Sequence, residues 1–228
     1  IFFFFSSELT EYVGDPLSVV CAVNENAITR PETHGIKDEE FIRGKAPMTK
    51  EEVRTVSLSK LCLAQDSICY DVGAGTGSLS IEMALRAHQG KVWAIEKKED
   101  AVELIRLNKA KFAADNLEIV EGLAPEALTE LPVPTHAFIG GSSGNLKEIV
   151  KLLIDKNPQV RIVINCITLE TVSEALETAK EFGFEENEIV QLNASRSKAI
   201  GRYHMMMGEN PIYIITLQNP GNSNVEKK

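Results

Sequence analysis

Short apolar runs alternate with amphipathic segments over most of the chain from residue 49 onward. The runs have the length of buried β-strands, and the segments between them repeat apolar residues at helical spacing. This alternation predicts strands at 67–72, 91–95, 117–121, 137–139 and 161–165. It predicts helices at 49–63, 78–87, 98–114, 146–156 and 169–182. Strands and helices that alternate in this way form a parallel sheet with helices on both faces.

The last part of the pattern contains strands without a helix. Residues 188–193 and 211–217 have the pattern of two strands, and the segment between them has no helical periodicity, so we interpret it as a loop. Two strands with no crossover helix between them pair antiparallel. We therefore expect a Rossmann-like α/β fold in three αβα layers. Its sheet is seven-stranded and mostly parallel, with an antiparallel strand pair at the C-terminal end.

Composition divides the chain into three parts. Residues 1–44 differ from the rest and contain a strand-like run at 17–23, followed by a polar linker with a proline. Residues 45–218 form the expected α/β domain, and residues 219–228 form a polar tail that we expect to be disordered. We interpret the first part as an N-terminal extension of the domain.

Charge and cysteine content narrow the classes of function. The chain has 43% hydrophobic residues and a net charge of −9, which suits a globular protein and disfavours binding to a phosphate backbone. No run approaches the roughly 20 apolar residues that span a bilayer. Cys62, Cys69 and Cys166 lie among aliphatic residues, so we expect them in the core. We expect no metal site and a reducing, cytoplasmic location.

A glycine-rich turn after the first strand is the strongest candidate for a ligand site. Glycines let the backbone turn sharply and leave no side chain between it and a ligand. Asp71 precedes the turn, where a carboxylate suits the cationic amino-acid end of a ligand. Glu96 ends the next strand, where an acid accepts hydrogen bonds from ribose hydroxyls. The turn itself consists of Gly73, Ala74, Gly75, Thr76 and Gly77.

The turn and the acid together suit either a dinucleotide or S-adenosylmethionine. A nicotinamide dehydrogenase more often has a G-x-G-x-x-G turn, together with a separate substrate domain for which this chain lacks room. The pattern therefore favours S-adenosylmethionine, with a nicotinamide oxidoreductase as an alternative.

Several short motifs resemble, in the same order, the decarboxylating precorrin-6Y methyltransferase family of cobalamin biosynthesis. The resemblance runs from about residue 35 to 217. Residues 8–34 resemble the tail of the carbon-5 methyltransferase domain that precedes this one in fused members. The motifs include Gly-Leu-Ala-Pro-Glu-Ala-Leu at 122–128 and lie at 35–41, 47–54, 71–78, 122–128, 138–142, 168–171, 195–197 and 210–213.

The resemblance implies a reaction, a cofactor and an assembly. The reaction is S-adenosylmethionine-dependent methylation of carbon 15 of a precorrin-6-type tetrapyrrole, with decarboxylation of the ring-C acetate. The assembly is a homotetramer, with a fused domain or a partner that methylates carbon 5. The family places the cofactor against residues that match Thr49, the turn Gly73–Gly77, Glu96 and Ala124. Thr49 and Glu52 also have the spacing of a helix capping box, which is compatible with that contact.

Two further sites suit the carboxylates of such a macrocycle. Gly140, Gly141 and Ser142 follow the fourth strand, where we expect their amides to face substrate carboxylates. The family usually has glycine where this chain has Ser143. Arg196 lies between the last two strands, and its guanidinium suits paired contact with a carboxylate.

The reaction demands little of the protein beyond alignment. Methyl transfer from a sulfonium to an enamine-like carbon needs no strong base, so we expect no obligatory nucleophile. Glu82 and Arg196 are the first candidates for a catalytic role.

Two other functions stay open at this point. A tRNA or protein methyltransferase has the same fold, although the acidic charge of the chain disfavours RNA. A subunit that binds S-adenosylmethionine as a scaffold predicts binding without turnover. We expect neither a nucleic acid nor a membrane as partner.

Overall fold

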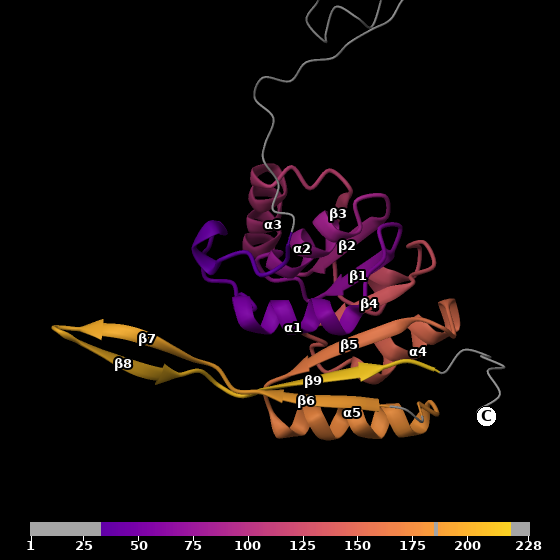
Figure 1. Ribbon diagram of the computed structural model, residues 1–228. Helices are drawn as coiled ribbons and strands as arrows, with labels where there is room; N and C mark the ends of the chain where they lie inside the picture. Colours follow the sequence, from indigo (N-terminus) through magenta and orange to yellow (C-terminus); the bar gives the residue numbers. More distant parts are fainter. Residues whose placement is uncertain (1–32, 185–186, 220–228) are drawn as a thin grey trace, which may run out of the picture.

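The computed structural model describes residues 33–184 and 187–219 and shows a helix-covered sheet with a projecting hairpin (Figure 1). The strand predicted at 17–23 and all of the predicted tail beyond residue 219 lie outside these ranges. Within them, no helix is both long enough and apolar enough to cross a membrane.

The main sheet has seven strands in the order β3-β2-β1-β4-β5-β9-β6. All neighbouring pairs are parallel except those of β9, which is antiparallel to both β5 and β6. The prediction of a mostly parallel sheet with an antiparallel pair at its end is therefore confirmed. The strands are β1 (Ile68–Val72), β2 (Lys91–Glu96), β3 (Leu117–Glu121), β4 (His136–Ile139), β5 (Arg161–Cys166), β6 (Asn187–Leu192) and β9 (Ile212–Leu217).

Helices cover both faces of the sheet and make three layers. On one face lie α1 (Glu51–Leu61), α2 (Ser78–Arg86) and α3 (Glu99–Lys111); on the other lie α4 (Leu146–Lys156) and α5 (Leu169–Glu181). Two short 3-10 helices complete the described elements: η2 (Asp38–Glu40) precedes α1, and η3 (Glu126–Leu128) lies between β3 and β4. Each predicted helix from residue 49 onward is confirmed to within a few residues at its ends.

Each face of the sheet has its own hydrophobic core, because successive strand residues point to opposite sides. In β1, Tyr70 and Val72 pack into the core beneath α4 and α5, whereas Cys69 packs into the core beneath α1, α2 and α3. The central strands β1, β2, β4 and β5 are buried on both faces, which explains why they appear in the sequence as continuous apolar runs.

The segment between β6 and β9 is a hairpin, so its interpretation as a loop was wrong. Strands β7 (Ser195–Ile200) and β8 (Tyr203–Gly208) pair antiparallel through a turn at Gly201 and project from the domain (Figure 1). Side chains on both faces of the hairpin are largely exposed. The strands therefore lack the apolar–polar alternation that marks a half-buried strand.

Two local expectations about α1 are also wrong. The helix begins after Lys50 with no side-chain cap, and the carboxylate of Glu52 bonds Arg196 instead of completing a capping box with Thr49. Cys62 lies at the end of the helix in a left-handed conformation and is exposed, although Leu61 and Leu63 on either side of it are buried. Cys69 and Cys166 are buried as expected.

A buried ionic network attaches the chain before α1 to the helical layer. Arg54 is fully buried, and its guanidinium lies 2.8 Å from an Asp38 oxygen and 2.9 Å from Glu82 Oε1. Glu82 also accepts hydrogen bonds from the backbone N–H groups of Gly35 (2.7 Å) and Ile36 (3.2 Å). Arg54 therefore neutralises two buried carboxylates and holds this segment on α1 and α2.

Removing the buried cation leaves Glu82 without a charged partner and leaves Asp38 with only Arg196 and Lys50. We expect Arg54→Met to lower the free energy of unfolding by about 3–5 kcal/mol, measured by urea denaturation. The exposed pair of Arg106 and Glu103, 3.3 Å apart, provides the control, because Arg106→Met should cost less than about 0.5 kcal/mol. Equal losses for the two variants would contradict a central role for the buried network.

Candidate functional site

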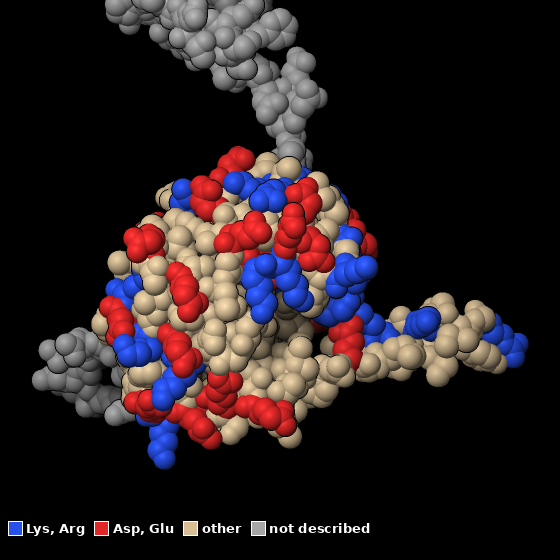
Figure 2. All heavy atoms as spheres, turned by 180° about the vertical axis from the view of Figure 1, so that it is seen from behind, with Lys and Arg blue, Asp and Glu red and all other residues tan. Residues whose placement is uncertain are grey.

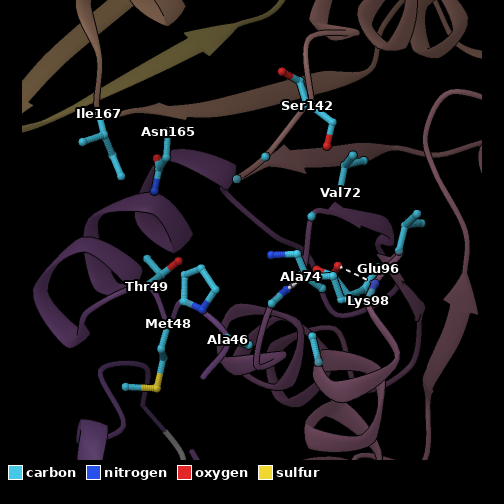
Figure 3. A pocket seen from close by; sticks show the side chains of 18 of the residues that line it. Ala46, Met48, Thr49, Val72, Ala74, Glu96, Lys98, Ser142, Asn165 and Ile167 are labelled. Atoms are coloured by element: carbon cyan, nitrogen blue, oxygen red, sulfur yellow. Dashed lines mark hydrogen bonds between the residues drawn. The ribbon is translucent and has the colours of Figure 1, made fainter. Parts of the chain in front are cut away.

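A cavity of about 760 Å³ opens at the carboxyl ends of the parallel strands. On the surface, a hollow bordered by Lys and Arg side chains lies beside the base of the hairpin (Figure 2). Thr49 lies on one side of the cavity, Glu96 and Lys98 on another, Ser142 on a third, and Asn165 with Ile167 on a fourth (Figure 3). The lining comes from segments 46–50, 72–75, 95–98, 122–124, 140–143 and 208–210, with several single residues.

The glycine turn forms the floor of this cavity and touches two walls through backbone atoms. A Cβ atom on Gly73 would lie 2.7 Å from the carbonyl oxygen of Gly141, and one on Gly75 would lie 2.6 Å from that of Pro47. Both glycines have positive φ angles, of 75° and 58°. A side chain at either position would therefore meet neighbouring backbone and add conformational strain.

Glu96 ends β2 and fixes the turn while it faces the cavity. Its Oε2 accepts a hydrogen bond from the N–H of Gly75 at 2.9 Å. Its Oε1 accepts from the N–H groups of Lys97 (2.9 Å) and Lys98 (3.0 Å). A carboxylate offers about four acceptor positions, so one position on Oε2 is left for a ligand.

Asp71 lies beneath the turn and does not line the cavity. The hydroxyl of Ser80 donates a hydrogen bond to one of its oxygens, and the other oxygen has no hydrogen-bond partner among the described residues. Burial raises the pKa of Asp71 to about 7, although the Ser80 hydrogen bond acts in the opposite direction. The expected contact of Asp71 with a cationic ligand group would therefore have to act through the turn.

The rest of the turn faces inward. Thr76 is buried, and its hydroxyl has no hydrogen-bond partner among the described residues. Gly77 has a φ of 74°, and a Cβ there would lie 3.0 Å from a side-chain carbon of Ile105 on α3. Of the five turn residues, only Gly73, Ala74 and Gly75 line the cavity.

The loop after β4 forms the opposite wall, although its first amides do not face the cavity. The N–H groups of Gly140 and Gly141 donate to the carbonyl of Val72, at 3.0 and 3.3 Å. These two N–H groups are thus already used in the pairing of β4 with β1, while Gly140 and Gly141 both line the cavity, and their contact with substrate stays a prediction. Ser142 lines the cavity, and Ser143 adopts a left-handed conformation with a φ of 56°.

Thr49 and Ala124 both lie at the cavity, as the family resemblance implied. Thr49 belongs to the wall before α1, which Arg54 holds by a hydrogen bond to the Thr49 carbonyl. Ala124 follows β3 and is buried, and its carbonyl accepts a hydrogen bond from Asn145 at 3.0 Å. Cofactor contact at the two positions stays a prediction.

Glu82 and Arg196 lie outside the cavity lining. Glu82 is buried against Arg54, and Arg196 lies in β7 within ion-pair distance of three carboxylates. The hydrogen bond from Arg196 lowers the pKa of Glu52 below its usual range. Glu82 and Arg196, the first candidates for a catalytic role, are therefore both paired with opposite charges, and the structure brings neither of them to the cavity.

Several cavity residues have no counterpart in the sequence expectations. Asn165 lies in β5 near its carboxyl end, where the side-chain oxygen is 3.2 Å from the hydroxyl of Ser57. The rule that ligands bind at the carboxyl edge of a parallel sheet would have suggested it. Met48 and Ile167 supply apolar surface, and neither belongs to a pattern that marks a site. No group of acidic, His or Cys side chains suited to a metal occurs among the described residues.

Comparison with known proteins identifies the family. The family model described as "Precorrin methyltransferase domain" matches residues 40–219. The chain belongs to this family. A relative from Pyrobaculum calidifontis, described as a probable cobalt-precorrin-6B C(15)-methyltransferase (decarboxylating), is 42% identical over 81% of this chain and 95% of its own length. A Salmonella typhimurium relative with the same description, without "probable", is 38% identical over 82% and 97%.

Solved structures of precorrin methyltransferases share the fold. A crystal structure of precorrin-6y C5,15-methyltransferase from Geobacter metallireducens has a TM-score of 0.79 and 39% identity, and covers 84% of this chain and 100% of its own. The predicted Rossmann-like fold of class I methyltransferases and the predicted family are both confirmed.

Burial of Asp71 predicts a pH dependence of stability. The pKa of this carboxyl rises from 3.8 to about 7 on folding, so its contribution to stability is complete below the lower value and is lost as the pH rises through 7. Asp71→Asn keeps an acceptor for Ser80 and removes the charge. The unfolding free energy of the wild type minus that of the variant should therefore fall between about pH 4 and pH 7 and level off above that. A constant difference across this range would contradict the raised pKa.

Proposed function

We propose that this chain methylates carbon 15 of a cobalt-precorrin-6B-type tetrapyrrole, with S-adenosylmethionine as methyl donor and with decarboxylation of the ring-C acetate. Membership of the precorrin methyltransferase family supports this reaction, and the descriptions of the relatives name it. The observation that carries the proposal is one cavity that joins the glycine turn and Glu96 to the loop after β4. A methyl donor bound at the glycine turn and Glu96 therefore lies next to a methyl acceptor bound at the loop after β4.

The donor half of the cavity fits S-adenosylmethionine. Gly73 and Gly75 leave no side chain above the floor, and Glu96 offers an acceptor for a ribose hydroxyl. Ala124 leaves space beside β3 for an adenine ring. A volume of about 760 Å³ lies within the range of about 300–1,000 Å³ that is typical of ligand pockets.

The chemistry requires alignment and exclusion of water more than acid–base catalysis. S-adenosylmethionine supplies a methyl group activated by its sulfonium. The walls at 46–50 and 140–143 orient the acceptor carbon toward that methyl group and exclude water. Decarboxylation releases carbon dioxide from the acetate, and the conjugated ring accepts the electron pair before a proton replaces the lost carboxyl group.

Turnover and donor binding test this proposal together. The wild type should transfer labelled methyl from S-adenosylmethionine to cobalt-precorrin-6B and release carbon dioxide. Glu96→Ala should weaken S-adenosylmethionine binding by about 1–3 kcal/mol in calorimetry, because a hydrogen bond to a charged group is lost. Glu118→Ala, at a half-exposed carboxylate that pairs with Lys91 on the sheet, is the control. Unchanged affinity of the Glu96 variant, or a folded enzyme without methyl transfer, would refute the proposal.

The proposal includes a homotetramer in which the β7–β8 hairpin contacts another copy of the chain. A two-stranded hairpin alone has marginal stability in water. This one leaves five apolar side chains about half exposed or more: Ile200, Tyr203, Met205, Met206 and Met207, at 48%, 61%, 52%, 65% and 49% exposure. A second copy that covers them would stabilise the hairpin. A carbon-5 methyltransferase as fused domain or partner, and a cytoplasmic location, stay predictions from the sequence.

The mass in solution tests the assembly. Light scattering should give the mass of four chains for the wild type. Met206→Glu should lower that mass, because it places a charge in the proposed contact. Lys151→Glu, on the exposed surface of α4, should leave the mass unchanged. A monomeric wild type at micromolar concentration would contradict the assembly.

A further inference from the structure

Three lysines line the cavity: Lys50, Lys97 and Lys98. They stand out in a protein whose net charge is −9. Positive side chains gather along the border of the hollow (Figure 2). A local cationic border on an acidic protein favours an anionic ligand at this place.

The carboxylates of the cavity wall do not neutralise these lysines. Glu96 is held by three backbone N–H groups. Glu209 lines the opposite side and lies 3.5 Å from the guanidinium of Arg196. Neither carboxylate forms an ion pair with the three lysines, because backbone N–H groups hold Glu96 and Arg196 is shared by Glu209, Asp38 and Glu52.

The side chain of Lys97 reaches across the cavity. The backbone N–H of this residue donates a hydrogen bond to Glu96, on the side of the cavity proposed for the methyl donor. Its ammonium donates to the hydroxyl of Ser143 at 2.9 Å, on the opposite side. Strand β1 separates β2 from β4 in the sheet, so the side chain crosses above the end of β1 and the glycine turn. Its charge is therefore placed between the donor half and the loop after β4.

The partner of that ammonium is a neutral hydroxyl. Lys50, by contrast, lies 3.7 Å from the carboxylate of Asp38. A carboxylate is a stronger acceptor than a hydroxyl for an ammonium, because both partners are charged. If a ligand carboxylate takes the place of the Ser143 hydroxyl as the acceptor, the hydrogen bond of Lys97 becomes stronger. The cost is small, because only the Ser143 hydroxyl then has to be hydrated by water.

We propose that Lys97 binds an acetate or propionate carboxylate of the tetrapyrrole and exchanges Ser143 for it when the substrate enters. This assigns to Lys97 the recognition that the sequence suggested for Arg196. The inference rests on the proposed function, because it takes the methyl acceptor to be a polycarboxylate. Its rival is contact between Lys97 and the carboxylate of S-adenosylmethionine itself.

The kinetics of variants without the charge of Lys97 show which carboxylate it binds, that of the tetrapyrrole or that of S-adenosylmethionine. Lys97→Gln should raise the tetrapyrrole KM about tenfold, as for the loss of one charged contact, and Lys97→Arg should restore most of it. The Kd for S-adenosylhomocysteine should change less than about twofold. Lys151→Gln, which removes an exposed lysine of α4, should leave the KM unchanged. An unchanged KM for Lys97→Gln, or an equal rise in KM and Kd, would overturn the proposal.

Ser143→Ala distinguishes recognition from a structural bridge. If the Ser143 hydroxyl only accepts a hydrogen bond from the Lys97 ammonium until substrate binds, Ser143→Ala should leave the tetrapyrrole KM unchanged or lower it. If the bond between Lys97 and Ser143 acts as a structural tie, both variants should raise KM alike, which would refute the exchange.

A binding measurement keeps this inference separate from the reaction. The probe is uroporphyrin, a tetrapyrrole with acetate and propionate side chains, whose fluorescence should be quenched when it binds the wild type. It should bind Lys97→Gln about tenfold more weakly. This result would hold even if cobalt-precorrin-6B gave no turnover. Equal affinity for the wild type and Lys97→Gln would overturn the role of Lys97 whatever the turnover assay shows.

Discussion

Contact between backbones is the constraint on which the cavity depends. The glycine turn after β1 lies so close to Gly141 and to Pro47 that neither Gly73 nor Gly75 has room for a Cβ atom. The turn thereby sets the distance between the two walls, and hydrogen bonds from Gly73 and Ala74 to the carbonyl of Ile95 hold it against β2. The glycines matter as much for bringing three segments together as for approaching a ligand.

The sequence predicted the central strands of the main sheet, β1, β2, β4 and β5, because they are buried on both faces. Continuous apolar runs and amphipathic helices are strong signals, and the predicted elements match the structure closely. The β7–β8 hairpin was missed because backbone pairing holds it together, while its side chains remain exposed. Side-chain patterning reports burial, so an element that buries little leaves no pattern.

The candidate site was predictable in part for a related reason. The turn, Glu96, Thr49 and Ala124 occupy positions that fold and family fix, and all reach the cavity apart from Thr76 and Gly77 of the turn. Glu82 and Arg196 were chosen for their charge, and charge alone does not show whether a group is free. Arg54, the partner of Glu82, lies 28 residues before it in the sequence, and Asp38 lies far from its partner Arg196. Only the fold shows that these groups are paired.

The position of Asp38 between two arginines has a consequence for how this family can vary. Its carboxylate lies 2.8 Å from Arg54 and 3.3 Å from Arg196, so one acid joins the helical layer to the base of the hairpin. Replacing any one of the three changes the charge balance around the buried Asp38 and Arg54 side chains. Substitutions at positions 38, 54 and 196 should therefore be inherited together across relatives, and a homologue that loses one of these residues should have changed the others as well.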